Sequence, residues 1–292
     1  MPAVRKAVIP AAGLGTRMLP ISRCVPKEMF PIVDRPAISY LVNEAIDSGM
    51  TEVLVIIGRE KNALEDYFDY SPEYDAALRA KGRENEVELI HAEVNRGNLF
   101  FTRQREKKGL GHAILQARSF VGDEPFAVLY GDDVIFSEMP VCRQLADCYE
   151  KYGRPVAGLK HVTKDQLPRF CSMKADPIPE DPGAYVITDM VEKPKPGCEF
   201  TDLAILGRVL LTPEIFDILD KTPPGAGGEI QLTDAMAEYA RHYGMTGRGF
   251  EGERFDLCSK LGFMAANLYA GIRHPEIGNE FSDFVREFAR GL

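Results

Sequence analysis

KAVIPAAGLGTRMLPISRCVPKEM, residues 6–29, is the stretch from which the architecture of this chain can first be inferred. Its apolar run at residues 7–9 predicts a buried strand, and the glycine-containing loop behind it predicts a sharp end to that strand. Glycines let backbone N–H groups approach a polyphosphate closely, and the cations that follow, Arg17 and Lys27, can neutralise its charge. The loop residues expected to hold such a ligand are Ala11, Ala12, Gly13 and Gly15.

The spacing of these glycines differs from that of two common phosphate-binding loops. A P-loop requires G-K-[ST] after its glycines, and the dinucleotide-binding fingerprint is G-x-G-x-x-G; the loop matches neither pattern. A dehydrogenase of the Rossmann type is therefore disfavoured. A simple glycine turn with solvated Arg17 and Lys27 is the ordinary alternative, and further motifs along the chain count against it.

Length and composition indicate a globular protein with a sizeable core. The 292 residues are 45% hydrophobic and 27% charged, which is ordinary for a globular chain. The net charge of −9, without a basic stripe, disfavours a nucleic-acid-binding protein. No apolar run approaches the ~20 residues that span a bilayer, and the first residues do not have the pattern of a signal peptide. The six cysteines show no C-x-x-C pairing, so we expect reduced thiols, a cytoplasmic location and no membrane partner.

Strand-like and helix-like patterns alternate over the first 165 residues. This alternation predicts an α/β fold with a doubly wound, mostly parallel, Rossmann-like sheet, whose ligands bind beyond the carboxyl ends of the strands. The predicted strands are 7–10, 53–57, 87–91, 126–131 and 155–162. The predicted helices between them are 37–47, 61–68, 111–120 and 141–151.

Prolines interrupt the next segment, residues 163–211, where we expect short pieces with some antiparallel pairing. The strands predicted within it are 184–192 and 203–211. Beyond residue 212 the predicted elements are helices at 213–220, 229–242, 259–272 and 280–290, with a short strand at 246–250. Because no linker-like or repeated segment separates these regions, we expect a single domain, 1–292.

Aspartates at two places are candidate metal ligands. Asp132 and Asp133 end the run VLYGDD, and Asp256 lies in FDLCSK, residues 255–260. Mg²⁺ prefers carboxylate oxygens together with phosphate and water oxygens. Acidic residues in solvated turns or loops are the ordinary alternative at both places.

The order and spacing of several motifs resemble the sugar-phosphate nucleotidylyltransferase family. The family pattern G-x-G-T-R followed by P-K matches residues 13–17 and 26–27. V-E-K-P at 191–194 and GEIQLTDA at 228–235 are similar to two further family segments. The similarity extends from residue 6 to about residue 278. It implies a nucleotide-binding half at 1–165, a small sugar-binding β region within 166–260 and C-terminal helices at 261–292.

The resemblance also implies a role for each matching residue. Asp132 and Asp256 would hold Mg²⁺, with Asp133 beside the substrate. Gln104 and Gly109 would recognise a pyrimidine base, since a glutamine side chain offers both a donor and an acceptor. The catalytic cations implied are Arg17, Lys27 and Lys193. Glu192 would bind the sugar hydroxyls, and Lys193 and Lys260 the phosphate of the sugar.

Two cysteines depart from the family pattern. Cys171 follows Phe170 where relatives carry Tyr-Gly, and Cys258 replaces the glycine usual after Phe255-Asp256. The backbone N–H of Cys171 could still face a sugar, but its side chain would narrow the sugar pocket. These departures leave the sugar specificity open.

With the GEIQLTDA segment, the resemblance implies uridylyl transfer from UTP to glucose 1-phosphate, dependent on Mg²⁺, in a homodimer or homotetramer. Within the same class, dTTP or another hexose 1-phosphate is an alternative substrate. From a different class, the chain could be a non-catalytic paralogue that binds a nucleotide sugar and regulates a partner. Every charged residue that the chemistry needs is present, which favours the enzyme.

Overall fold

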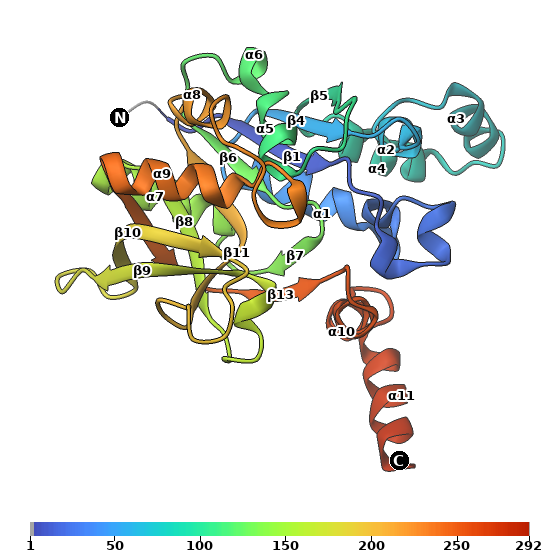
Figure 1. Ribbon diagram of the computed structural model, residues 1–292. Helices are drawn as coiled ribbons and strands as arrows, with labels where there is room; N and C mark the ends of the chain where they lie inside the picture. The colour runs from blue at the N-terminus through green and yellow to red at the C-terminus, as the bar shows by residue number, and fades with distance from the viewer. Residues whose placement is uncertain (1–2, 292) are drawn as a thin grey trace.

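The computed structural model describes residues 3–291, which fold around one large mixed sheet of nine strands (Figure 1). Its strands are β1 (Lys6–Ala11), β4 (Glu52–Ile57), β5 (Asn98–Arg103), β6 (Phe126–Leu129), β8 (Val156–His161), β9 (Cys171–Pro177), β10 (Ala184–Glu192), β11 (Leu203–Leu211) and β12 (Met245–Gly249). Their order across the sheet is β5-β4-β1-β6-β11-β8-β12-β10-β9. Within the described residues, only β11 and β10 run against the other strands, so the mostly parallel sheet predicted from the sequence is confirmed.

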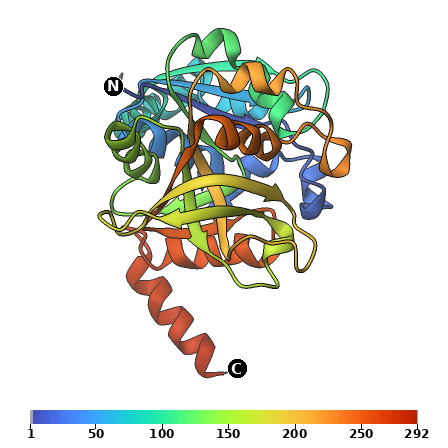
Figure 2. The same cartoon turned by 60° about the vertical axis from the view of Figure 1, so that its left-hand side comes forward.

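Helices cover both faces of this sheet, as Figure 2 shows from a second side. One face packs against α1 (Ala37–Asp47) and α7 (Val141–Tyr152), and the other against α5 (Leu110–Leu115), α8 (Ile215–Leu219) and α9 (Leu232–Tyr243). The side chains of β1 alternate between these faces. Ala7 and Ile9 pack in the core under α1 and α7, and Val8 packs in the core under α5, α8 and α9. The remaining helices are α2 (Asn62–Tyr67), α3 (Pro72–Arg79), α4 (Glu84–Val94), α6 (Arg118–Val121), α10 (Lys260–Gly271) and α11 (Gly278–Arg290). No helix in residues 3–291 is long and apolar enough to cross a bilayer.

Two small antiparallel pairs lie outside the large sheet. β2 (Pro31–Ile32) pairs with β3 (Arg35–Pro36), and β7 (Asp133–Phe136) pairs with β13 (Glu253–Asp256). In the second pair Asp256 lies opposite Asp133, which joins two segments far apart in the sequence. The sequence predicted neither pair, because each is short and its partner strand is distant or only a few residues long.

One predicted strand is wrong. Residues 87–91 belong to α4, and the edge strand beside β4 is β5 instead. The run VELI contains enough apolar residues for a strand, but only Val87 is buried, and Leu89 and Ile90 face solvent. The glutamates around it favour a helix, and this helix packs against α3.

Two helix predictions need smaller corrections. The helix predicted at 111–120 is two helices, α5 and α6, separated by a turn at Gln116 and Ala117. The helix predicted to begin at Glu229 begins at Leu232, because Glu229 and Gln231 have extended backbone. The antiparallel partner of β10, strand β9, was not predicted individually, although antiparallel pairing in this region was.

Candidate active site

Three segments meet beyond the carboxyl end of β1. The loop after β1 carries Arg17 and Lys27 in short 3₁₀ turns, and the turn between β6 and β7 carries Asp132. The approach of this turn to β1 depends on Gly131, where a Cβ atom would lie only 2.8 Å from the carbonyl oxygen of Pro10. The third segment is the turn after β13, whose Leu257 N–H donates to the carbonyl of Asp132 at 2.9 Å. Backbone contacts therefore hold the three segments together before any side chain is considered.

The side chains of Asp132, Asp256 and Cys258 form one compact group of donor atoms. One ligand atom from each lies within 4.8 Å of the other two. The Cys258 thiol donates to Asp132 Oδ2 at 3.0 Å, and the Cys258 backbone N–H donates to Asp256 Oδ1 at 2.9 Å. A group of two carboxylates and a thiol can hold a divalent cation. We call these three residues the acidic–thiol group.

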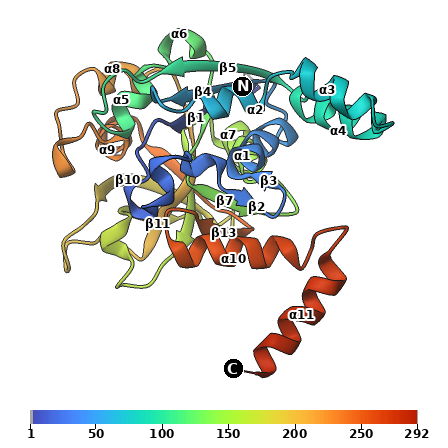
Figure 3. The same ribbon diagram turned by 90° about the vertical axis from the view of Figure 1, so that its right-hand side faces the viewer.

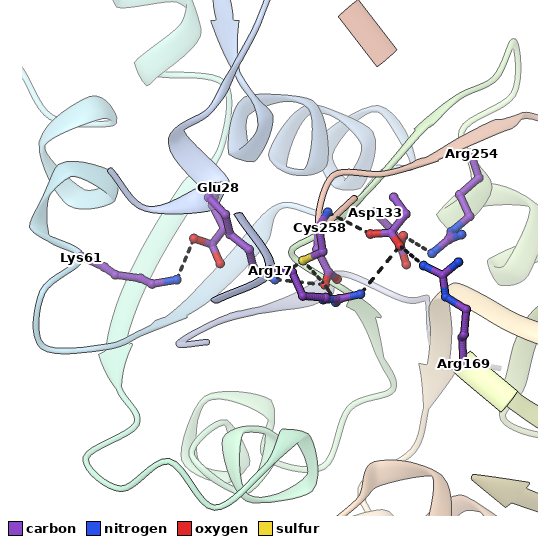
Figure 4. A network of polar contacts seen from close by, with 10 residues as sticks. Arg17, Glu28, Lys61, Asp133, Arg169, Arg254 and Cys258 are labelled. Atoms are coloured by element: carbon purple, nitrogen blue, oxygen red, sulfur yellow. Dashed lines mark hydrogen bonds and ion pairs between the residues drawn. The ribbon is translucent and has the colours of Figure 1, made fainter. Parts of the chain in front are cut away.

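Three cationic side chains surround the acidic–thiol group (Figure 4). Lys27 Nζ lies 3.0 Å from Asp132 Oδ2 and 3.0 Å from Cys258 Sγ. Arg17 reaches Asp132 Oδ2 at 3.6 Å and Asp256 Oδ2 at 3.9 Å, and Arg169 reaches Asp256 Oδ2 at 4.0 Å. Arg17 and Arg169 are largely exposed, whereas Lys27 is nearly buried. The two guanidinium groups are therefore accessible to an anionic ligand.

The charges of this cluster stabilise one another. Burial lowers the pKa of Lys27, but Asp132, Cys258 and Glu28 together outweigh that effect, and the net shift is upward. Burial likewise raises the pKa of Asp132, but the attraction of Lys27 and hydrogen bonds from Cys258 and Lys27 bring it well below its usual range. Asp132 is therefore an anion and Lys27 a cation throughout the neutral range.

Asp133 lies on the other side of the same turn. Its side chain is buried and forms an ion pair with Arg254 of β13 at 2.5 Å, and burial raises its pKa to about 6. Arg254 in turn lies over the ring of Phe170. The structure does not bring Asp133 into the acidic–thiol group; its contacts join the β7–β13 pair to the segment that carries Phe170 and Cys171.

A buried ion pair supports the loop that carries Lys27. Glu28, the next residue, accepts a hydrogen bond from Lys61 Nζ at 2.7 Å, and both side chains are buried. Burial raises the pKa of Glu28 and lowers that of Lys61, because the attraction between the two charges offsets only part of their desolvation. The contact joins the loop after β1 to the segment after β4 and so positions Lys27.

Gln104 and Gly109, predicted together from the sequence, do lie together. Gln104 Nε2 donates to the carbonyl of Gly109 at 3.1 Å and lies 3.0 Å from His112 Nδ1. Gly109 has φ +101°, and a Cβ atom there would lie 2.7 Å from the carbonyl of Ile230, so a side chain does not fit. Gln104 lines a cleft of about 960 Å³ at the end of β5.

The residues predicted for the sugar side form a second cluster at the ends of β9 and β10. Cys171 and Glu192 are opposite each other across these strands, and the Lys193 N–H donates to the carbonyl of Phe170 at 2.8 Å. Lys193 Nζ lies 3.7 Å from Glu192 Oε1. The Tyr130 side chain is enclosed beside this cluster: burial first, and then Cys171 and Glu192, raise the pKa of its hydroxyl well above the usual value.

Lys260 is not brought into either cluster by any contact between described side chains. It is the first residue of α10 and is exposed, and among residues 3–291 its ammonium forms no ion pair. Its place is set by Ser259, whose side chain accepts the Gly262 N–H and caps the helix.

Sequence reasoning did not find three of these contacts. Arg169 lies one residue before the Phe170-Cys171 pair, but an exposed arginine in a proline-rich segment gives no signal of its own. Arg254 is likewise inconspicuous until β13 pairs with β7. Cys258 was recognised only as a replacement of glycine, although its position two residues after Asp256 could have suggested a third donor atom.

The comparisons with known proteins identify the class. A family model described as nucleotidyl transferase matches residues 6–253, which is most of the chain. The chain belongs to this family, and it is a nucleotidyltransferase.

Individual relatives narrow the comparison. A UTP–glucose-1-phosphate uridylyltransferase of Bacillus subtilis is 44% identical over 285 residues, covering 98% of this chain and 97% of that protein. The enzyme of the same name from Staphylococcus haemolyticus is 42% identical over 287 residues, covering 98% and 99%. A crystal structure of UDP-glucose pyrophosphorylase complexed with UDP-glucose superposes with a TM-score of 0.81 at 38% identity, over 90% of this chain and 97% of that one. UDP-glucose pyrophosphorylase from Acinetobacter baumannii superposes with a TM-score of 0.89 at 32% identity, over 98% and 99%.

Proposed function

We propose that this chain catalyses uridylyl transfer from UTP to glucose 1-phosphate, which yields UDP-glucose and pyrophosphate. The proposal is supported by relatives of that activity at 42–44% identity over nearly the whole chain. The observation that carries it within the molecule is the meeting of Arg17, Lys27 and Asp132 beyond the carboxyl end of β1. This is the edge of a parallel sheet at which such folds bind nucleotides.

The attacking group in this reaction needs no general base. A sugar phosphate has a second pKa near ~6, so its oxygen is already anionic at neutral pH. The protein therefore has to align that oxygen with the α-phosphorus of UTP and neutralise the charge that develops on the leaving pyrophosphate. The exposed guanidinium of Arg17 and the ammonium of Lys27 suit the second task.

The loop after β1 is proposed to hold the triphosphate. Ala11 and Ala12 are buried at the end of the strand, and Gly15 has a positive φ of +67°, so the backbone between them bends sharply. N–H groups exposed by such a bend can bind phosphate oxygens. Gly13 has open space around its Cα, which leaves room for a ligand to approach it.

Asp132 and Asp256 fit a Mg²⁺ ion, because each offers a carboxylate oxygen in one compact group. The ion would supply further positive charge to the phosphates of UTP. The acidic–thiol group also explains the position of Lys27, because the ammonium of Lys27 neutralises the charge of the Asp132 carboxylate.

The base and the sugar are proposed to lie on opposite sides of this centre. Gln104, held by Gly109, presents an amide to the uracil edge. On the sugar side, Glu192 accepts sugar hydroxyls, and Lys193 and Lys260 attract the sugar phosphate. Cys171 and Asp133 then shape the wall behind the sugar rather than contact the reacting atoms.

Three further expectations from the sequence belong to the same proposal: one domain spanning 1–292, a cytoplasmic location and a homodimer or homotetramer. The assembly is supported by the apolar side chains that α11 exposes, Phe284 and Phe288.

Pyrophosphate release tests the proposed reaction. The purified chain is incubated with Mg²⁺ and either UTP or dTTP, each combined with a panel of hexose 1-phosphates. We expect UTP with glucose 1-phosphate to give the highest kcat/KM. Equal turnover with dTTP, or a preference for another sugar, would contradict the proposed substrates. The absence of turnover with every pair would contradict the proposal that the chain is an enzyme.

Lys27→Met tests the proposed electrostatic role. Because the ammonium is lost while the length of the side chain is nearly kept, we expect kcat/KM to fall by about 10²–10³. Lys81→Met, an exposed lysine beyond α3, is the matched control and should leave the rate unchanged. Circular dichroism of both variants checks that the fold is kept, and a near-normal rate in Lys27→Met would exclude that residue from the mechanism.

A further inference from the structure

His112 lies beside the glutamine that is proposed to read the base, and the proposed function gives it no role. It belongs to α5, and its Nδ1 atom is 3.0 Å from Gln104 Nε2. Gln104 is only 7% exposed, so little water is available to replace a partner that its amide loses. A hydrogen bond in such a position requires a matched donor and acceptor.

The carbonyl of Gly109 determines which way the amide of Gln104 faces. A carbonyl oxygen only accepts hydrogen bonds, so the amide atom that lies 3.1 Å from it is the nitrogen, Nε2, which donates one of its two N–H bonds. The second N–H is left for His112 Nδ1. Because an amide nitrogen donates and does not accept, Nδ1 has to be the acceptor. The imidazole of His112 is therefore neutral and carries its proton on Nε2.

Both N–H bonds of the Gln104 amide are thus used inside the protein, and its carbonyl oxygen is left for a ligand. Among residues 3–291 no donor forms a hydrogen bond with Oε1, and this atom is not sealed from solvent. Gln104 lines the cleft at the end of β5. A base that meets Oε1 has to offer a donor. The N3–H of uracil does so, whereas N3 of cytosine is an acceptor and would oppose the oxygen.

The backbone holds His112 in place without help from Gln104. The Gly111 N–H donates to the carbonyl of Ile230 at 2.8 Å, and a Cβ atom on Gly111 would lie 2.9 Å from the same oxygen. The start of α5 is therefore in close contact with the segment of Ile230. The side chain of Gln116 donates to the carbonyl of His112 at 3.1 Å. His112 is thus a fixed support against which the amide of Gln104 is oriented.

We propose that His112 is a positioning residue for base selection. By accepting the second N–H of Gln104, it keeps Oε1 free to face the base and so favours a pyrimidine with an N3–H over cytosine. Without this acceptor, Gly109 holds one N–H and the other is buried without a partner, so the amide gains by turning that N–H toward an acceptor such as cytosine N3. The inference rests on the proposed function, because it concerns the base site of the same reaction.

Nucleotide binding tests this role in the full chain. The dissociation constants of UTP and CTP are measured by isothermal titration calorimetry with Mg²⁺ and without a sugar phosphate. We expect the parent protein to bind UTP about a hundredfold more tightly than CTP, because one base gains a hydrogen bond and the other opposes two acceptors.

Two variants of similar shape separate the acceptor from the volume of the side chain. His112→Leu and His112→Asn both give a side chain that branches at Cγ, but only asparagine offers an oxygen near the position of Nδ1. We expect His112→Leu to weaken UTP binding about tenfold and to reduce the preference over CTP about tenfold, and His112→Asn to retain most of both. His242→Leu, which replaces an exposed histidine of α9, is the control and should bind as the parent does.

An equal loss in His112→Leu and His112→Asn would assign His112 a purely structural role and overturn the inference. So would a parent that binds CTP as tightly as UTP, or a His112→Leu protein with the parent's two dissociation constants. Circular dichroism checks the fold of each variant, and His112→Ala takes the place of His112→Leu in the same measurements if the leucine variant does not fold.

Pyrophosphate release with UTP and glucose 1-phosphate is measured on the same proteins. In His112→Leu the KM for UTP should rise about tenfold while kcat changes little, because His112 acts through Gln104 and not on the reacting atoms. A parent that binds UTP selectively but releases no pyrophosphate contradicts only the proposed reaction. Normal turnover of the parent, with binding unchanged in His112→Leu, contradicts only the role of His112.

Discussion

Gly131 and Gly207 determine how the turn after β6 presents its two aspartates. A Cβ atom on Gly131 would meet the Pro10 carbonyl at 2.8 Å, and one on Gly207 would meet Asp133 Oδ2 at 2.6 Å. Gly207 also has a positive φ of +82°, which side chains rarely adopt. The turn is therefore held close to β1 on one side and to β11 on the other. As a result, Asp132 lies with Asp256 and Cys258, whereas Asp133 pairs with Arg254.

Cys171 is the residue at which we expect sugar preference to change. Its side chain is buried opposite Glu192, and burial raises the pKa of its thiol to about 12, so it acts as a small neutral side chain. Cys171→Gly removes that volume beside the proposed sugar site. We expect the ratio of kcat/KM between glucose 1-phosphate and other hexose 1-phosphates to change about tenfold, the scale of one side-chain carbon in a pocket.

The comparison variant for this prediction is Cys148→Ala, which removes a buried thiol in α7. It should leave the ratio unchanged even if it lowers stability. An unchanged ratio in Cys171→Gly as well would mean that the thiol does not shape the sugar pocket.

At the scale of elements, a buried ion pair joins α1 to β11. Arg208 of β11 is fully buried and donates to both carboxylate oxygens of Glu44, at 2.9 and 2.6 Å. Burial alone would lower the pKa of Arg208, but the Glu44 carboxylate raises it above the usual value. Glu44 Oε1 also accepts the backbone N–H of Cys142 at the start of α7. One carboxylate thus connects two helices and the centre of the sheet.

Removing one partner of this pair should destabilise the fold strongly. Arg208→Met leaves Glu44 buried without its counter-charge, and we expect the free energy of unfolding to fall by about 3–5 kcal/mol. The double variant Glu44→Leu with Arg208→Met removes both charges and should recover most of that loss. Urea denaturation at pH 7 measures the parent, the single variants Glu44→Leu and Arg208→Met, and the double variant. If the double variant loses as much free energy of unfolding as the two single variants added together, the pair is needed for more than mutual charge neutralisation.

Asp181, in the connection between β9 and β10, accepts hydrogen bonds from two other elements. Lys151 and Tyr152 of α7 donate to Oδ2 at 2.8 and 2.7 Å, and Arg248 of β12 donates to Oδ1 at 3.0 Å. The bonds from Lys151 and then Tyr152 lower its pKa to about 2. Because the pKa is lower in the folded than in the unfolded chain, the contribution of Asp181 to stability is complete above about pH 4 and is lost as the pH falls toward 2.

Asp181→Asn should therefore lower the free energy of unfolding by about 1 kcal/mol at pH 7, and this difference should shrink between about pH 4 and pH 2. Urea denaturation at pH 7, 4 and 3 would measure the difference. Asp147→Asn, which removes an exposed partner of Arg143 within α7, is the control and should have a smaller effect at every pH. A difference for Asp181→Asn that stays constant with pH would contradict the assignment.

Several elements could be predicted from the sequence, and the failures share one cause. The bounds of α1, β10 and β11 coincide with those predicted, because long apolar patterns with clear ends specify them. The strand predicted at 87–91 failed because a short apolar run is compatible with either a strand or a helix until its neighbours are known. β7 and β13 have four residues each and exist only as a pair.

At the scale of the whole molecule, α11 projects away from the body of the chain (Figure 3). Phe281 packs against Gly271 of α10, but Phe284 and Phe288, one and two turns further along, are 61% and 62% exposed. Their rings are stacked along one side of the helix. An amphipathic helix with one apolar stripe uncovered is expected to pack against a partner, and we propose a second copy of this chain.

Phe284→Ser with Phe288→Ser should shift the chain toward the monomer, because each buried phenylalanine contributes about 1.5–3 kcal/mol to such a contact. Light scattering coupled to size-exclusion chromatography measures the mass. Arg286→Ala, on the same helix but outside the apolar stripe, should leave the mass unchanged. A monomeric parent protein, or an oligomer that is unaffected by the double variant, would exclude this surface as the interface.

The sequence by itself determined the fold class and the position of the loop of residues 11–15 at the carboxyl end of the first strand. These features depend on neighbours along the chain: an apolar strand, the glycines that end it and the basic residues that follow. The contact of Gln104 with Gly109 could also be predicted from the sequence, because only five positions separate the two residues.

Only the tertiary structure decided that Cys258 joins Asp132 and Lys27, since 126 positions separate Cys258 from Asp132 and 231 separate it from Lys27. The same holds for the ion pairs of Arg169 with Asp256 and of Arg254 with Asp133. The physical reason is that these contacts depend on the antiparallel pairing of two four-residue strands. Neither strand has a pattern of its own, and each forms only when the rest of the sheet brings the two together.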